Sequence, residues 1–219
     1  MPIWNTRLAC WLPSYRVSME TPTLLRDEAG ILDHKRGRAY RVGSTDWMSF
    51  GGSTPFPEPE LIRMLEPNDV LKELQDLKDN GFLSDTLLRR AVKDIAVADD
   101  RFDWVGVYLV NSEEGVVWLH NYVGKPTPHS KIPVGEGICG TAVAEGKNSN
   151  VPDVSAVDNY IVRDPRVKSE MVVLIRGDDE IFGLIDIDSR TVEAFTNEDS
   201  AAVQVVTDKL AEQLAQERS

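Results

Sequence analysis

A change of hydrophobic period near residue 100 is the feature that most restricts the fold of this chain. Ser84 stands where a helix cap is expected, before five apolar residues at helical spacing: Leu87, Leu88, Ala91, Val92 and Ile95. The run WVGVYLV at 104–110 is rich in β-branched and aromatic residues and predicts a strand. Helices on either side of a block of strands indicate an α+β fold.

Two strand pairs are predicted after this point. NSEEG is typical of a hairpin turn, and VVWLHNYV of the returning strand. SEMVVLI and IFGLIDID form the second pair around GDDE. In the first strand Trp104, Gly106 and Tyr108 share one face, because alternate residues of a strand point the same way; Val105, Val107 and Leu109 share the other.

Helices are expected before and after these strands. Asn68 is expected to cap a helix that ends at Asn80-Gly81, and Thr196 with Asp199 resembles a capping box. The last helix has an apolar stripe of Val203, Val206, Leu210 and Leu214. The stripe is either packed in the core or forms a dimer seam with the helices at 61–78 and 84–96.

The glycine-rich stretch IPVGEGICGT at 132–141 lies between a strand end and a short helix that ends at Gly146. Its glycines permit a tight turn or a close approach of the backbone, either as a plain loop or as a ligand cradle. The excursion at 148–168 has little periodicity, and loops of this length are often functional.

Composition excludes several classes of protein. The chain has 219 residues with a net charge of −12, which argues against binding to a nucleic-acid backbone. We find neither a signal peptide nor the ~20 apolar residues of a membrane helix. Two distant cysteines, Cys10 and Cys139, suggest a reducing cytoplasmic compartment. The three histidines show no metal-ligand spacing with them, so no metal and no cofactor are expected.

Residues 1–55 differ from the rest, with seven basic and five acidic side chains. The Gly/Pro-rich run FGGSTPFPEPE at 50–60 marks the boundary. We therefore predict an N-terminal extension at 1–55, a helical connector at 56–81 and the main domain at 82–219. One hypothesis makes the extension the working part and the domain a dimerising scaffold.

The main domain resembles a GAF domain. The similarity rests on the order of elements and on WVGVYLV, IPVGEGICGTAV, VPDVSAVDNYI, SEMVVLI, FGLIDIDS and FTNED. The resemblance implies a central antiparallel sheet with helices on one side and a ligand cavity under loops on the other. It also implies that end helices commonly build a homodimer.

Within that family the motifs are most similar to the free methionine-(R)-sulfoxide reductases. Those enzymes attack the sulfoxide with a cysteine thiolate, and other thiols then resolve the sulfenic acid. The resemblance places Arg163, in IVRD, at the position of the nucleophile, and His129 at that of an earlier cysteine. Cys139 matches the remaining family cysteine, although a small buried cysteine of structural role would look the same.

The resemblance also implies a pocket for an amino-acid-like or cationic ligand, lined by Trp104, Tyr108, Glu170, Asp186 and Asp188, with the charge of Arg163 added. Asp186 and Asp188 share a strand face. An odd hairpin loop would set Glu170 opposite Asp186, whereas an even loop would send Glu170 to the other face. Alternatively, the aspartates only bond neighbouring loops.

These observations lead to two functional hypotheses. The first is a non-catalytic, sensory or regulatory GAF domain protein that binds a small molecule, forms a homodimer and signals through a protein partner. The alternative is a divergent free methionine-(R)-sulfoxide reductase that uses Cys139.

Overall fold

The computed structural model describes residues 25–27, 30–33, 38–40, 65–178 and 180–218. The chain divides into two compact units, Met1–Leu61 and Ile62–Ser219. In the first unit, β1 (Leu25–Asp27), β2 (Gly30–Asp33) and β3 (Arg38–Tyr40) pair antiparallel in that order. Cys10 and most of the predicted extension lie outside the described residues, so the domain limits and the role of residues 1–55 stay predictions.

The second unit is built on a six-stranded antiparallel sheet in the order β6-β5-β4-β9-β8-β7. Its central strands are the two predicted pairs: β4 (Trp104–Asn111) with β5 (Val116–Val123), and β8 (Ser169–Arg176) with β9 (Ile181–Ser189). Two short strands, β6 (Lys131–Pro133) and β7 (Ser149–Val151), form the edges. This is the predicted α+β architecture.

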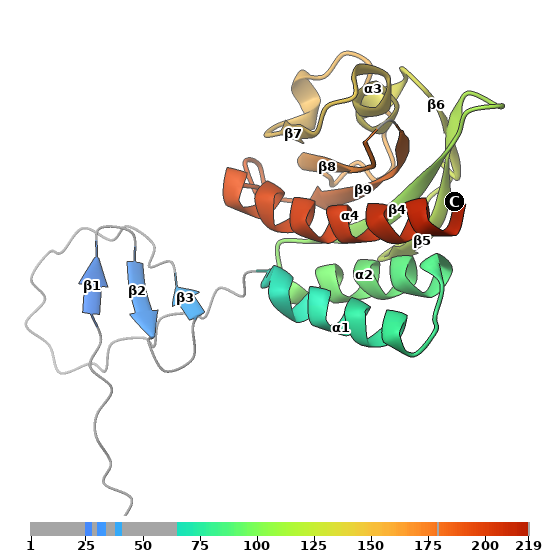
Figure 1. Ribbon diagram of the computed structural model, residues 1–219. Coiled ribbons are helices and arrows are strands. Elements are labelled where there is room, and N and C mark those ends of the chain that lie inside the picture. Colours follow the sequence, from blue (N-terminus) through green and yellow to red (C-terminus); the bar gives the residue numbers. More distant parts are fainter. Residues whose placement is uncertain (1–24, 28–29, 34–37, 41–64, 179, 219) are drawn as a thin grey trace, which may run out of the picture. The chain divides into compact units, whose positions relative to one another are not determined.

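The helices cover the two faces of the sheet unequally (Figure 1). Two of them, α2 (Ser84–Ala98) and α4 (Asn197–Arg218), pack on one face, and α1 (Pro67–Asp79) packs against both of them. The other face carries α3 (Gly137–Glu145), the 3₁₀ turn η1 (Val154–Ala156) and the loop up to residue 168. The loop-covered face is the side on which the ligand cavity is expected.

Two predicted helix caps are wrong, by two residues for α1 and by one residue for α2. Pro67 is the first residue of α1 and Glu66 is its N-cap, because proline needs no hydrogen-bond partner for its nitrogen in the first turn. Ser84 is the first residue of α2 rather than its cap, and its Oγ donates to Glu217 Oε2 at 2.6 Å. The prediction for α4 is confirmed, since Thr196 N donates to Asp199 Oδ2 at 2.8 Å.

The apolar residues divide into two clusters, one on each side of the sheet. Val105 and Val107 face the helices, whereas Trp104 and Tyr108 face the loops, as alternation predicts. The stripe on α4 is buried in the helix-side cluster: Val203, Val206, Leu210 and Leu214. Core packing is therefore the correct interpretation of the stripe, and a homodimer would have to use other residues.

Over the described ranges, no helix combines the length and the apolar character needed to cross a membrane.

The register of β8 with β9 decides where the acidic residues point. The loop between the two strands, residues 177–180, has an even number of residues. With a regular register, an even loop would place Glu170 on the sheet face opposite to that of the aspartates. A register shift between Ile175 and Arg176 restores the parity, so Glu170 pairs with Asp188 and Val172 with Asp186. All three carboxylates thus lie on the loop side, although Glu170 is opposite Asp188 and not Asp186.

Candidate functional site

Trp104 is buried on the loop side of the sheet, in contact with the side chain of Arg163. Its ring stacks on Tyr122 with centroids 5.8 Å apart, and its Nε1 donates to Lys125 O at 3.0 Å. Two glycines make room for it: a Cβ on Gly106 would lie 2.2 Å from the ring, and one on Gly124 would lie 2.5 Å from it. The orientation of the indole therefore depends on positions where only hydrogen fits.

Three carboxylates from β8 and β9 form the floor of a pocket on the loop side of the sheet. Glu170 and Asp186 are each 6% exposed and Asp188 is 2% exposed. Burial raises the pKa of Glu170 and of Asp186 well above the usual range, and the charge of neighbouring aspartates raises both further. Burial also raises the pKa of Asp188, to about 6, against the lowering effect of Arg163. These carboxyl groups therefore favour the binding of a proton or of a cation, because either reduces the negative charge of the floor.

Cys139 reaches this floor from the first turn of α3. The preceding turn requires glycine at two points, since Gly135 has a φ of 94° and a Cβ on Gly140 would lie 2.2 Å from Pro133 O. The thiol sulfur lies 3.8 Å from Glu170 Oε1. Burial and the nearby Asp186 raise the pKa of Cys139 well above that of a free thiol. The thiol therefore stays protonated unless a proton acceptor or a cation intervenes.

Arg163 extends from the loop after η1 into the same pocket. Its Nε donates to Asp188 Oδ2 at 2.6 Å, and a second nitrogen of the guanidinium pairs with the same oxygen. The guanidinium carbon lies 4.6 Å from the centroid of the Trp104 ring. The side chain is only 10% exposed. The pocket thus already holds a cation between a carboxylate and an aromatic face.

Two segments close the pocket. His129 Nε2 donates to Val162 O at 3.1 Å, which joins the segment before β6 to the loop that carries Arg163. The His129 carbonyl in turn accepts a hydrogen bond from the Tyr108 hydroxyl at 3.2 Å. The cavity that remains measures about 30 Å³. That volume holds roughly two water molecules and not a whole amino acid.

Most of the residues predicted for the site line one pocket: Tyr108, Cys139, Arg163, Glu170, Asp186 and Asp188. Trp104 is not part of the lining and lies behind Arg163, whose guanidinium it contacts. Sequence reasoning missed Tyr160 and Ile161 in the pocket lining, and Tyr122 behind Trp104. Tyr122 lies opposite Gly106 only because the register of β4 with β5 shifts between Val107 and Tyr108, and alternation along the strand does not predict that shift. Tyr160 and Ile161 lie in a loop without periodicity, where no such pattern exists.

Comparison with known proteins gives the family. The profile of the GAF domain matches residues 84–214, which contain every site residue above. The chain belongs to the GAF domain family. The free methionine-R-sulfoxide reductase of Escherichia coli is 35% identical over 113 residues, which are 52% of this chain and 67% of that protein.

Solved structures extend the likeness of this GAF domain. The type II free methionine-R-sulfoxide reductase from Thermoplasma acidophilum is 32% identical, with a TM-score of 0.57 over 64% of this chain and 96% of that one. The reductase from Neisseria meningitidis, solved in complex with its substrate, is 26% identical, with a TM-score of 0.64 over 69% of this chain and 90% of that one. The GAF domain is therefore closely homologous to these reductases.

Proposed function

We propose that the GAF domain binds a free amino acid of the methionine sulfoxide class through its ammonium group. The proposal rests on the position of the Arg163 guanidinium in the pocket. Asp188 and the Trp104 ring hold a guanidinium between them, so the same pair of groups can hold the ammonium of a ligand. Glu170 and Asp186 lie beside them, and neither has an ion-pair partner among the described residues.

The ligand enters by displacing Arg163. The cavity of about 30 Å³ is too small for an amino acid while the guanidinium occupies its seat. Moving Arg163 outward opens the face of Trp104 and exposes Asp188, and the loop that carries it is held to the segment before β6 by His129. Binding therefore couples to an opening of residues 157–168.

Calorimetry with matched ligands tests the proposal. The protein, kept free of metal with a chelator, is titrated with methionine-(R)-sulfoxide and with its N-acetyl derivative, which lacks the ammonium. We expect the free amino acid to bind and the acetylated one to bind at least tenfold more weakly, with Asp188→Asn abolishing the difference. Equal binding of the two ligands, or no binding of either at millimolar concentration, would refute the proposal.

A second candidate function is reduction of the sulfoxide by Cys139, which the homology to reductases favours. The Cys139 thiol lies beside Glu170, and the raised pKa of Glu170 provides a carboxylic acid able to protonate the sulfoxide oxygen and so activate the sulfur for attack. The sulfur of Cys139 would attack the sulfoxide sulfur and take over its oxygen, giving the sulfide and a sulfenic acid. Two external thiols would then reduce the sulfenic acid to the thiol, releasing water and a disulfide.

Turnover distinguishes the two candidates. Reduction of free methionine-(R)-sulfoxide with excess dithiothreitol, lost in Cys139→Ser and kept in Cys10→Ser, would establish the enzyme. Binding without turnover would support the binding function alone. Four properties stay predictions: a sensory output, a homodimer, a protein partner and a cytoplasmic location. Size-exclusion chromatography with light scattering checks the homodimer.

A further inference from the structure

Two of the three carboxyl groups in the pocket lack a basic partner among the described residues. Among the described residues, the ion pair of Arg163 with Asp188 is the only one that involves a pocket carboxylate. Glu170 and Asp186 face the cavity with no basic partner, and both are more than nine-tenths buried. Within the described part of the chain, Asp186 Oδ1 has no hydrogen-bond partner at all. A buried carboxyl oxygen without a partner is costly, and either a proton or a bound cation would stabilise it.

The donor atoms around that position converge. One oxygen each from Glu170 and Asp186 and the sulfur of Cys139 lie within 4.8 Å of one another. The sulfur is already 3.8 Å from Glu170 Oε1. Ligands of a tetrahedral zinc ion, with bonds of ~2.0–2.3 Å, lie about 3 to 4 Å apart. The three atoms therefore need to close by only about 1 Å around an ion.

The donor set and the space select the kind of ion. One thiolate with two carboxylates suits a borderline-soft divalent ion such as zinc better than magnesium or calcium, which prefer oxygen alone. The cavity of about 30 Å³ accepts an ion with a bound water. A divalent ion would also hold Cys139 as thiolate, the state that burial otherwise opposes.

We propose that Cys139, Glu170 and Asp186 form a site for zinc or a similar thiophilic divalent cation, with a fourth position open to the cavity. Arg163 does not occupy this site, because its guanidinium is neutralised by Asp188 on the Trp104 side. No spacing in the sequence points to such a site: the donors come from α3, β8 and β9 and meet only in the fold. The site shares Glu170 and Asp186 with the pocket proposed for the amino acid, so amino-acid binding is measured on metal-free protein and metal binding without amino acid, and either can fail without the other.

Cobalt substitution tests the site. The full-length protein is stripped with a chelator and titrated with Co²⁺, and zinc affinity is measured by competition with a chromophoric chelator. We expect one metal per chain and a thiolate-to-cobalt charge-transfer band. Cys139→Ser should remove the band and weaken zinc binding about tenfold or more, and Glu170→Gln and Asp186→Asn should weaken it similarly.

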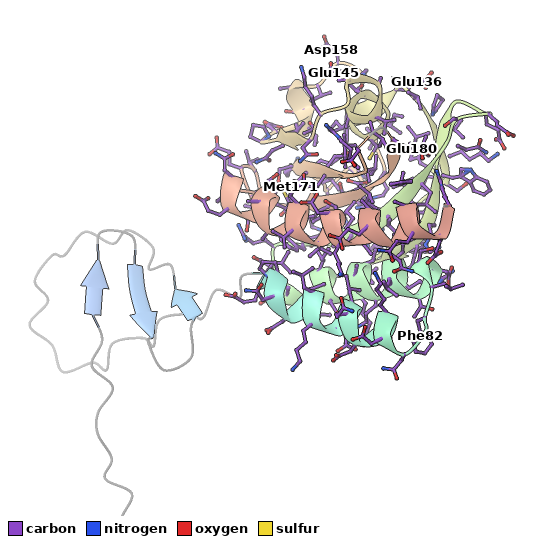
Figure 2. All side chains as sticks on the ribbon, in the orientation of Figure 1. Phe82, Glu136, Glu145, Asp158, Met171 and Glu180 are labelled. Atoms are coloured by element: carbon purple, nitrogen blue, oxygen red, sulfur yellow. The ribbon has the colours of Figure 1, made fainter. Side chains whose placement is uncertain are left out.

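Matched variants separate this site from other thiols and acids. Cys10→Ser and Asp158→Asn should leave both band and affinity unchanged; Asp158 is exposed at the outer end of the loop layer (Figure 2). Far-UV circular dichroism confirms that each variant is folded, and Glu170→Gln replaces Cys139→Ser if the latter is not. The proposal is overturned if the stripped protein binds neither metal, or if the band survives in Cys139→Ser.

Discussion

Replacing Arg163 with methionine should tighten binding of free methionine sulfoxide by about 30-fold or more. The ligand has to break a charge-assisted bond to Asp188, which contributes ~1.5–3 kcal/mol, and a contact with Trp104 that contributes ~0.5–2 kcal/mol. The lower limits together give about 2 kcal/mol, which corresponds to about 30-fold in affinity. Methionine has a similar length but no charge, so this cost disappears while the loop keeps an apolar side chain.

Isothermal titration at constant pH provides the measurement, with Arg166→Met as the control. Arg166 lies on the same loop but is 47% exposed and pairs with Asp164, so its loss should leave affinity unchanged. The ligand-free Arg163→Met protein should be less stable, because Asp188 loses the cation that lowers its pKa, and ligand should restore the difference. If folded Arg163→Met binds the ligand no more tightly than the parent protein, the Arg163 guanidinium does not compete with the ligand. The proposal that the ammonium group binds between Asp188 and Trp104 is then refuted.

Three further substitutions test the scaffold. Gly106→Ala should weaken ligand binding at least tenfold and cost about 1–3 kcal/mol in stability, because the new methyl group would displace the Trp104 ring; calorimetry and urea unfolding measure the two effects. Asp199→Asn should cost about 1.5–3 kcal/mol at pH 7, since it removes the charge that accepts hydrogen bonds from Arg101, which is partly exposed and keeps its pair with Asp99. The pKa of Asp199 is lowered in the fold, so its contribution is fully present above the unfolded value of 3.8 and is lost as the pH falls below that value; the gap to the parent protein in urea unfolding should therefore narrow steadily below pH 3.8. Leu210→Ala should cost about 2–5 kcal/mol by the same assay and leave ligand affinity unchanged, because Leu210 packs on the helix side of the sheet.

Local patterns were sufficient to predict the strands and the faces they present. Alternation in 104–110 assigned Trp104 and Tyr108 to one side and Val105 and Val107 to the other, and the structure has them in separate clusters. The capping pair Thr196 and Asp199 likewise predicted the start of α4 within one residue. These features depend on neighbours in sequence, so the sequence contains the information that determines them.

Other features depend on contacts between distant segments and could not be predicted. The face to which Glu170 points depends on the register shift between Ile175 and Arg176, and no pattern in the sequence predicts that shift. The position of Arg163 depends on a loop without periodicity that is fixed by contacts to β9 and to His129. The meeting of Cys139 with Asp186 follows from the packing of α3 on the sheet.

The register shift between Ile175 and Arg176 lies at the turn end of the β8–β9 hairpin, and it determines which side chains of β8 face the pocket. Because side chains alternate along a strand, adding or removing one residue there would exchange the two faces of β8. Glu170 would then point into the helix-side core, and Met171, now buried under α4, would point into the pocket. A change of length in a surface turn that touches no ligand would thus convert an acidic pocket into an apolar one. Across related proteins, the length of this turn should vary together with the residue at position 170, as though the two were neighbours.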